Sequence, residues 1–371
     1  GKDVIVLAAG EPDFNTPKNI RDAASKAMEE GKTKYVPGKG TPELQKAIQK
    51  KFREDNNIDY QLDEIICGVG GKHIIYNAMM ATINPGDEVI ITAPFWVSYP
   101  DIVLLAEGKP VIVKCPQSQN FKITPEQLEK NINSKTKWLM LNSPSNPTGS
   151  VYSKKELEDL ALILKKYPNV LIMCDDIYEK IVYDGVEFHT LASIEPSLKE
   201  RCLTLNGVSK SYCMTGWRLG YCGAPKEIIT AMNKIQSQST TSTSSITMAA
   251  AVEAISGPQD FINEHNKKFL KRRDLVLNKL NDIDGITCQK PEGAFYVYPN
   301  CEGIIGKKTA NGKHISNDED FMTYLLEDQG VAGVHGAAFG LSPYFRLSYA
   351  TSDAILEDAC NRIKEACNKL T

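Results

Sequence analysis

SKSYCMTGWRLGY, residues 209–221, joins two short apolar segments of the chain. The flanking segments, 202–206 and 219–223, are β-prone, and each is predicted to be a buried parallel strand. Lys210 and Arg218 therefore lie in a loop between two core strands. Partial desolvation disfavours the ammonium form of a lysine, so its amine can form a Schiff base with an aldehyde. The alternative, a solvated lysine beside an arginine paired with a surface carboxylate, stays open on this stretch alone.

Short apolar strands alternate with helices from residue 65 onward. Such alternation predicts an α/β fold, here a mostly parallel seven-stranded sheet with helices on both faces. The strands are expected at 65–69, 88–92, 110–114, 137–142, 169–174, 202–206 and 219–223. Helices are expected between them at 72–82, 154–166 and 226–238, the second opened by a capping box from Ser153 to Glu156. Ligands of these sheets bind at the carboxyl ends of the strands.

A chain of 371 residues favours two domains. A long helix at about 259–281 is expected to lead from the sheet into a smaller α+β domain. This domain is predicted to contain strands 286–290, 294–298, 331–335 and 345–349, helices near 318–328 and 353–369, and a solvated loop at 299–317. We expect the large domain to span 38–270 and the small domain to combine 1–37 with 271–371.

Two further elements are expected near the start of the chain. A strand is predicted at 4–7, and a helix is predicted to begin with Thr16 as N-cap and Pro17 at its first position. A second helix is predicted after Thr41, followed by Pro42 in the same arrangement.

The composition is that of a soluble globular protein, with 42% hydrophobic and 24% charged residues. A net charge of −3 gives no electrostatic reason to expect nucleic acid or an anionic membrane as a partner. No apolar run approaches the roughly 20 residues that span a bilayer. The ten cysteines contain no CxxC pair and lie mostly in apolar runs, which predicts buried reduced thiols in a cytoplasmic protein. The five histidines lack metal-ligand spacing, so no metal site is expected.

Residues suited to binding follow the predicted strands. GVGGK, residues 68–72, opens a helix, so its backbone amides can hold a phosphate. It is neither a Walker loop nor a dinucleotide fingerprint, because His73 stands where each motif needs another residue, and a simple tight turn is the alternative. Trp96 follows strand 88–92 and can stack on a planar ring or serve as a core side chain.

Four more candidates come later in the chain. Asn146 lies between two prolines, either as a ligand-binding amide or in a proline-stabilised turn. Asp175 ends a very apolar strand, where an acid is costly to bury unless it meets a cation such as a protonated pyridine nitrogen. Tyr178 would then reach a phenolic oxygen of the same ring. For the acid, the alternative is a helix N-cap carboxylate, a role that suits Asp176 better than Asp175. Arg346 in a strand suits bidentate binding of a carboxylate, or an internal ion pair.

Together these features describe a pyridoxal phosphate enzyme that acts on an amino acid. The chain resembles the class I aminotransferases of pyridoxal-phosphate fold type I, especially the bacterial aspartate aminotransferase branch with prephenate-accepting members. The matching blocks follow the family order over nearly the whole chain: 10–14, 34–35, 70–72, 95–99, 142–149, 175–178, 209–221 and 346–349. The resemblance implies transfer of an amino group from L-aspartate to 2-oxoglutarate by a ping-pong mechanism. An aromatic or prephenate aminotransferase, or a lyase or synthase with the same cofactor, is the alternative.

The resemblance also implies the residues that bind the cofactor through attachment, phosphate contacts, hydrogen bonds and stacking. They are Lys210 for covalent attachment, Arg218, Gly71 and Lys72 for the phosphate, Asp175 for the ring nitrogen, Tyr178 and Asn146 for the ring oxygen, and Trp96 for stacking. Family members often carry a serine three residues before the lysine. This chain has Gly207 there, so Ser209 is expected to supply that phosphate contact.

For the substrate, the resemblance implies that Arg346 holds the α-carboxylate, with Gly10 and Asn146 nearby. Lys72 and Thr16 are the candidates for the distal carboxylate of a dicarboxylic donor, unless Lys72 contacts only phosphate or solvent. Tyr35 is expected to reach the phosphate of the neighbouring subunit, which implies a homodimer with shared sites. The sequence begins almost at the first predicted strand, so we expect the N-terminal arm usual in the family to be truncated or disordered.

Overall fold

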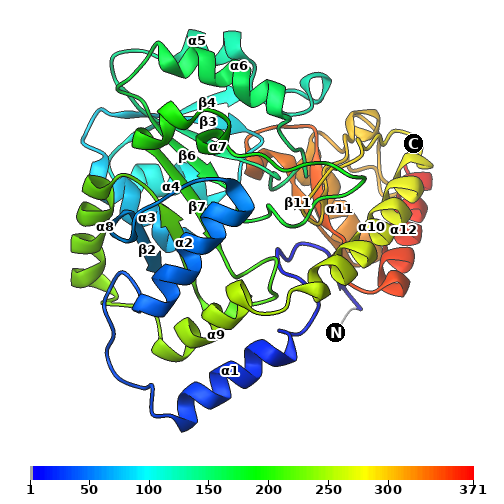
Figure 1. The fold of residues 1–371 in the computed structure, drawn as a ribbon. Coiled ribbons are helices and arrows are strands. Elements are labelled where there is room, and N and C mark those ends of the chain that lie inside the picture. Colours follow the sequence, from blue (N-terminus) through cyan, green and yellow to red (C-terminus); the bar gives the residue numbers. More distant parts are fainter. Residues whose placement is uncertain (1–2) are drawn as a thin grey trace.

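A seven-stranded sheet forms the centre of the molecule (Figure 1), and the computed structural model describes residues 3–371. The strands lie in the order β2-β8-β7-β6-β5-β3-β4. All seven predicted strands are confirmed to within two residues: β2 Ile65–Gly68, β3 Glu88–Ala93, β4 Lys109–Lys114, β5 Thr136–Asn142, β6 Leu171–Asp175, β7 Cys202–Gly207 and β8 Gly220–Gly223.

The predicted parallel direction of β8 is wrong. This strand runs antiparallel to both of its neighbours, β2 and β7. Parallel neighbours need a crossover connection, usually a helix, whereas residues 208–219 contain only the short 3-10 helix η4, Thr215–Trp217. The chain therefore turns back at the same edge of the sheet, and the loop with Lys210 stays at the carboxyl end of β7.

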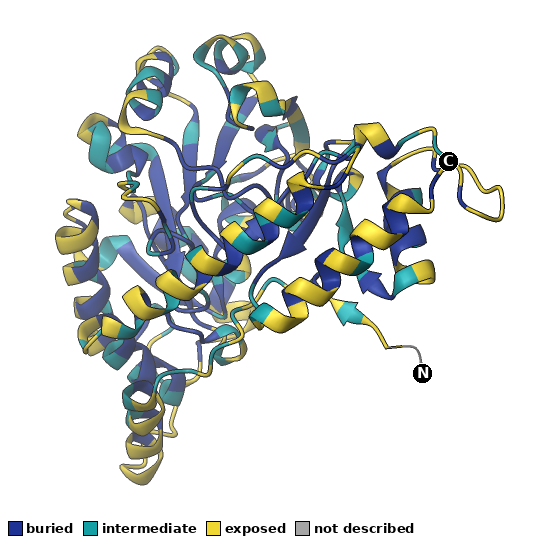
Figure 2. Ribbon diagram, turned by 90° about the vertical axis from the view of Figure 1, so that its right-hand side faces the viewer, coloured by how far each residue is buried: buried dark blue, intermediate teal, exposed yellow. Residues whose placement is uncertain are grey.

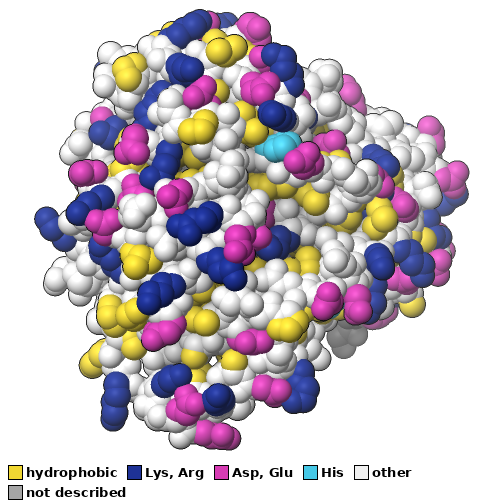
Figure 3. Space-filling view, in the orientation of Figure 1, with side chains coloured by type: hydrophobic (Ala, Val, Ile, Leu, Met, Phe, Trp, Pro, Cys, Tyr) yellow, Lys and Arg dark blue, Asp and Glu magenta, His cyan; other side chains and the backbone are white. Residues whose placement is uncertain are grey.

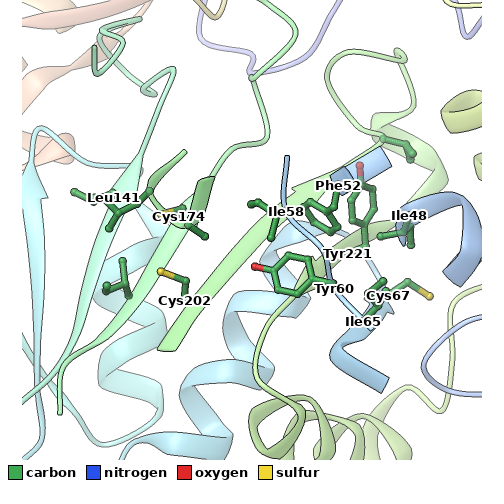
Figure 4. Close-up of a cluster of buried hydrophobic side chains, with 14 of the residues drawn as sticks. Ile48, Phe52, Ile58, Tyr60, Ile65, Cys67, Leu141, Cys174, Cys202 and Tyr221 are labelled. Carbon is green, nitrogen blue, oxygen red and sulfur yellow. The ribbon is translucent and has the colours of Figure 1, made fainter. Parts of the chain in front are cut away.

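Alternating side chains of the strands fill an apolar layer on each face of the sheet. Ile65 and Cys67 of β2 enter one layer, which also holds Phe52 and Tyr221 (Figure 4), whereas Ile66 enters the other. Exposed residues lie mainly on the outer sides of the helices (Figure 2). All ten cysteines are buried and free of disulfide bonds, as predicted.

Helices pack over both layers and precede or follow most of the strands. They are α1 Lys18–Glu29, α2 Pro42–Asn56, α3 Gly71–Thr82, α4 Ser98–Leu105, α5 Pro125–Asn131, α6 Lys154–Lys165, α7 Leu191–Ile194, α8 Lys226–Ser239 and α9 Ser245–Ser256. The predicted caps of α2 and α6 are confirmed: the Thr41 hydroxyl accepts from the Leu44 amide, and Ser153 forms a capping box with Glu156.

The predicted capping role of Thr16 is wrong. Pro17 occupies the N-cap position of α1, and no side chain caps that helix. The Thr16 hydroxyl instead donates to the Cys213 carbonyl oxygen at 2.6 Å and accepts from Trp217 Nε1 at 3.0 Å. These two bonds attach the start of the chain to the loop that carries Lys210.

A second group of elements packs beyond the sheet around its own apolar cluster. Helix α10, Asp260–Asn281, leads into it (Figure 1). The other elements are β1 Ile5–Val6, β9 Tyr296–Val297, β10 Val331–Ala332, β11 Val334–His335, β12 Phe345–Ser348, α11 Asp318–Gln329 and α12 Asp353–Asn368. Strand β1 pairs in parallel with β10, and the other three form a sheet in the order β11-β12-β9.

The predicted strand 286–290 is wrong. The segment makes only an isolated bridge between Thr287 and Asn300, while the Asn281 side chain bonds both backbone groups of Cys288. The predicted strand 331–335 is divided at Gly333, where a Cβ atom would lie 2.7 Å from Leu347 Cδ2. Most of the predicted loop 299–317 is irregular, with one 3-10 helix, η5 Glu302–Ile304.

The division into domains 38–270 and 1–37 with 271–371 stays a prediction, and residues 1 and 2 lie outside the described residues. No helix among residues 3–371 is long and apolar enough to cross a membrane. Acidic and basic side chains are intermingled on the face drawn in Figure 3, in keeping with the small net charge of the sequence.

Candidate active site

A cavity of about 480 Å³ lies where the carboxyl ends of the sheet strands face the second group of elements. Residues from both parts of the fold line it. Most of the predicted site residues are among them: Gly10, Gly71, Lys72, Trp96, Asn146, Asp175, Tyr178, Ser209, Lys210, Arg218 and Arg346. The two exceptions are Thr16 and Tyr35.

Lys210 follows β7 and extends toward the N-terminal segment, where its Nζ donates to the Gly10 carbonyl oxygen. The Tyr178 ring lies 5.7 Å from Nζ. Burial lowers the pKa of Lys210 to about 8, and the positive charge of Arg346 acts in the same direction. The neutral, nucleophilic amine is therefore more abundant at neutral pH than in a solvated lysine.

Asp175 is the last residue of β6, and its carboxylate is buried. The Tyr99 hydroxyl donates to Oδ2 at 2.6 Å, and the Ile177 amide donates to Oδ1 at 3.3 Å. Burial raises the pKa of Asp175 to about 6, against the opposing effect of the Tyr99 hydrogen bond. Both donors are uncharged, so the carboxylate is suited to meet a cation in the cavity.

Arg346 lies within β12 and is also buried. Its Nη1 donates to Asn146 Oδ1 at 2.8 Å and its Nη2 donates to the Ala8 carbonyl oxygen at 2.7 Å, while its buried Nε has no partner. The guanidinium carbon lies 4.6 Å from the centre of the Tyr296 ring and 5.0 Å from that of Phe339. The alternative of an internal ion pair is not found among residues 3–371. A buried cation with neutral partners and a free N–H group suits a carboxylate ligand.

One end of the cavity gathers donors that suit a phosphate. Gly71 and Lys72 form the first turn of α3, whose amides have no partner within the helix. Arg218 packs so closely over Gly70 that a Cβ atom on this glycine would lie 2.4 Å from Nη2. Ser209 is buried and lines the same cavity. Helix N-terminal amides, a guanidinium and a hydroxyl together form a favourable anion site.

Trp96 lines the cavity and is only partly buried, unlike a tryptophan of the core. Its ring packs edge-on against Tyr99, with centroids 5.5 Å apart. The Lys72 Nζ lies 4.9 Å from the Trp96 ring centre, so this cation stands beside the aromatic wall although the residue is exposed to solvent. Asn146 is held by its amide, which donates to Asn142 Oδ1 at 2.8 Å.

Thr16 and Tyr35 lie outside this cavity. Thr16 lines a neighbouring open hollow that it shares with Arg218, and its hydroxyl is already bonded to Cys213 and Trp217. Tyr35 is 93% exposed. A single chain therefore does not bring Tyr35 to the cavity, and its predicted contact with a neighbouring subunit stays a prediction.

Sequence reasoning missed two tyrosines of the cavity wall. Tyr99 holds Asp175, and its position three residues after Trp96, on the same side of a helical turn, was a usable signal. The Tyr296 hydroxyl shares a 2.7 Å hydrogen bond with that of Tyr178. These residues are 118 positions apart, so no spacing pattern could have linked them.

The cavity fits pyridoxal phosphate on its own chemistry. It offers an amine of lowered pKa at Lys210, a buried acid with only neutral donors at Asp175, and an anion site around Gly71. The unpartnered Nε of Arg346 adds a place for a carboxylate. These are the groups that an aldehyde, a pyridine nitrogen, a phosphate and an amino acid require.

Curated relatives match the chain over its whole length. An aspartate aminotransferase of Rhizobium meliloti (strain 1021) is 55% identical over 371 residues, which cover 100% of this chain and 90% of the relative. An aspartate/prephenate aminotransferase of Cereibacter sphaeroides is 56% identical over the same number of residues and is covered to 93%.

Solved structures give the same result for the fold. The crystal structure of an aspartate aminotransferase from Rhizobium meliloti has a TM-score of 0.98 at 55% identity, covering 100% of this chain and 92% of that one. The Thermus thermophilus aspartate aminotransferase with maleate has a TM-score of 0.91 at 39% identity, covering 98% and 92%. The model of the family "aminotransferase class I and II" matches residues 2–363. This chain belongs to the class I and II aminotransferase family.

Proposed function

We propose that the chain is a pyridoxal-phosphate-dependent aminotransferase that converts L-aspartate and 2-oxoglutarate to oxaloacetate and L-glutamate. The observation that carries the proposal is Arg346, a buried cation without an acidic partner, on the wall shared with Lys210 and Asp175. The names of the two curated relatives support aspartate as the amino donor.

Each part of the cofactor has a proposed partner in the cavity. Lys210 would bind it covalently, Asp175 would pair with the ring nitrogen, and Trp96 would stack on the ring. The remaining contacts would come from Tyr178 and Asn146 at the ring oxygen and from Gly71, Lys72, Ser209 and Arg218 at the phosphate. When bound, pyridoxal phosphate supplies an electron sink for the electron pair left at the substrate Cα.

The chain supplies orientation and proton transfer. Arg346 would hold the α-carboxylate in a fixed plane, because Asn146 and the two aromatic rings already fix its guanidinium. Lys210 would take the proton from the substrate Cα and would deliver it to the carbon of the cofactor that had carried the aldehyde oxygen. Its pKa of about 8 suits both directions of transfer near neutral pH.

The distal carboxylate of aspartate needs a cation or strong donors. Lys72 is the proposed contact, because it stands beside Trp96 at the cavity wall. Thr16 is the weaker candidate, because its hydroxyl is already engaged with Cys213 and Trp217. A second candidate function, transamination of aromatic acids or prephenate, is favoured by Val334 and Phe339, which give the same cavity an apolar wall.

Assembly and location are also proposals. A homodimer would bring Tyr35, which is exposed in the single chain, to the phosphate of the neighbouring site. Ten buried free thiols support a cytoplasmic location.

The visible spectrum of the cofactor-loaded protein, recorded before and after addition of aspartate, tests the function. An amino donor should convert the cofactor to its amine form, and 2-oxoglutarate should restore the first spectrum. A screen of donors and acceptors that includes phenylalanine and prephenate separates the two candidates. Conversion of substrate without this spectral exchange would favour a lyase or synthase, and turnover by Lys210→Ala would contradict the role of the lysine.

A further inference from the structure

Tyr99 is a buried side chain that connects α4 to the end of β6. Its hydroxyl donates to Asp175 Oδ2 at 2.6 Å, the length of a charge-assisted O–H···O⁻ bond. The ring is fixed edge-on against Trp96 at an interplanar angle of 88°, and the Tyr99 amide donates to the Trp96 carbonyl oxygen at 3.0 Å. The hydroxyl therefore has little freedom to leave the carboxylate.

The other titratable groups around Asp175 give its negative charge little support. Lys210 acts on it only through its charge and makes its own hydrogen bond to Gly10. Asp176 is a second buried acid next along the chain, and repulsion between the two carboxylates raises the pKa of Asp176 further. Tyr178 is a neutral phenol whose hydroxyl is bonded to Tyr296. Tyr99 is thus the hydroxyl that holds the carboxylate directly.

We propose that Tyr99 is a positioning residue that keeps Asp175 ionised and oriented, so that the acid can bind the ring nitrogen of pyridoxal phosphate at neutral pH. This inference rests on the proposed function, which assigns Asp175 to that nitrogen. In this role Tyr99 acts through Asp175, and no direct contact with the reacting atoms is assigned to it.

The direction of the effect follows from the hydrogen bond. Burial already raises the pKa of Asp175 to about 6, and the Tyr99 bond opposes this rise. Loss of a hydrogen bond to a charged group moves a pKa by roughly one to two pH units. In Tyr99→Phe the acid would therefore be largely protonated at neutral pH and ionised only in alkaline solution.

The test is the dissociation constant of pyridoxal phosphate, measured by equilibrium dialysis with the full chain between about pH 6 and pH 9. In the wild type the part of the affinity that depends on Asp175 should fall only as the pH approaches 6 from above, and the ratio of the variant and wild-type dissociation constants cancels the titration of Lys210, which both proteins share. In Tyr99→Phe this fall should begin one to two units higher, which weakens binding about 10-fold or more at pH 7 and restores it near pH 9. Tyr152→Phe is the matched control, because this buried hydroxyl accepts from the Ile123 amide and does not contact Asp175.

Recovery at alkaline pH separates the proposal from a merely structural role. A loss of affinity that is equal at pH 7 and pH 9, or a curve that coincides with the wild type, would overturn it. Asp175→Asn should bind the cofactor weakly at every pH. If that variant bound as tightly as the wild type, the assignment of Asp175 in the proposed function would fail as well, so the two failures can be distinguished.

Discussion

Replacement of Arg346 by leucine tests the carboxylate site most directly. The guanidinium has two neutral acceptors, Asn146 Oδ1 and the Ala8 carbonyl oxygen, and one buried N–H group without a partner. A leucine would keep apolar contact with Tyr296 and Phe339 but could not bind an anion. The substitution therefore removes the proposed ligand of the α-carboxylate and leaves the surrounding packing largely in place.

The magnitude follows from the bonds that the substrate would lose. Two hydrogen bonds to a charged group are worth about 1.5 to 3 kcal/mol each, or about 3 to 6 kcal/mol together. With about 1.4 kcal/mol for each factor of ten, kcat/KM should fall roughly 10²-fold to 10⁴-fold. The free energy of unfolding should fall much less, by about 2 kcal/mol or less. The substitution leaves two carbonyl oxygens without a donor, which is destabilising, but it also removes a buried charge that has no acidic partner, which is stabilising.

The assay is steady-state kcat/KM for aspartate and for phenylalanine, with urea unfolding as the stability control. Every amino acid carries the α-carboxylate, so both donors should lose activity by a similar factor. Arg346→Lys keeps the charge without the planar fork and should fall between the wild type and Arg346→Leu. A folded Arg346→Leu enzyme within tenfold of the wild type for both donors would refute the assignment.

Four further outcomes are expected. Lys72→Ala should reduce kcat/KM for aspartate more than for phenylalanine, and an equal loss for both donors would argue against contact with the distal carboxylate. The rate constant for pyridoxal phosphate uptake by the cofactor-free chain should rise with pH through about 8 as Lys210 loses its proton, and a flat profile would contradict the lowered pKa. Saturating succinate should move the midpoint of that profile to higher pH, and Arg346→Leu should abolish the move. Gly207→Ser should lower the free energy of unfolding by about 1 to 3 kcal/mol in a urea titration. A Cβ atom at this position would lie 3.0 Å from Ile177 Cδ1 and 3.1 Å from the Leu219 carbonyl oxygen. Unchanged stability would show that the site has room for a serine.

Most of the cavity could be predicted from the sequence because its residues follow apolar strands. The carboxyl ends of parallel strands meet at one edge of a sheet, so a residue such as Asp175 could be assigned to the site from its place after β6. The direction of β8 could not be read from its apolar pattern, since buried strands of either direction look alike. The absence of a helix between Lys210 and β8 was the informative signal.

Contacts between side chains far apart in the chain were beyond such reasoning. Threonine is a preferred N-cap residue, yet the Thr16 hydroxyl bonds to Cys213 and Trp217, about 200 residues away. Local propensity describes the neighbours of a residue in the chain, whereas these partners are fixed only by tertiary packing.

The positive charge of the cavity links the binding of the substrate to the reactivity of the lysine. Burial and the charge of Arg346 both lower the pKa of Lys210 while the carboxylate site is free. A carboxylate bound to Arg346 would offset that charge and so remove one cause of the lowered pKa, although burial and the smaller effect of Arg218 would remain. The pKa of Lys210 should then rise, and the amine should become a stronger base at the moment when it has to take the Cα proton. This is the reason for the succinate prediction: a midpoint that did not move, or that moved equally in Arg346→Leu, would mean that the arginine binds the substrate without tuning the lysine.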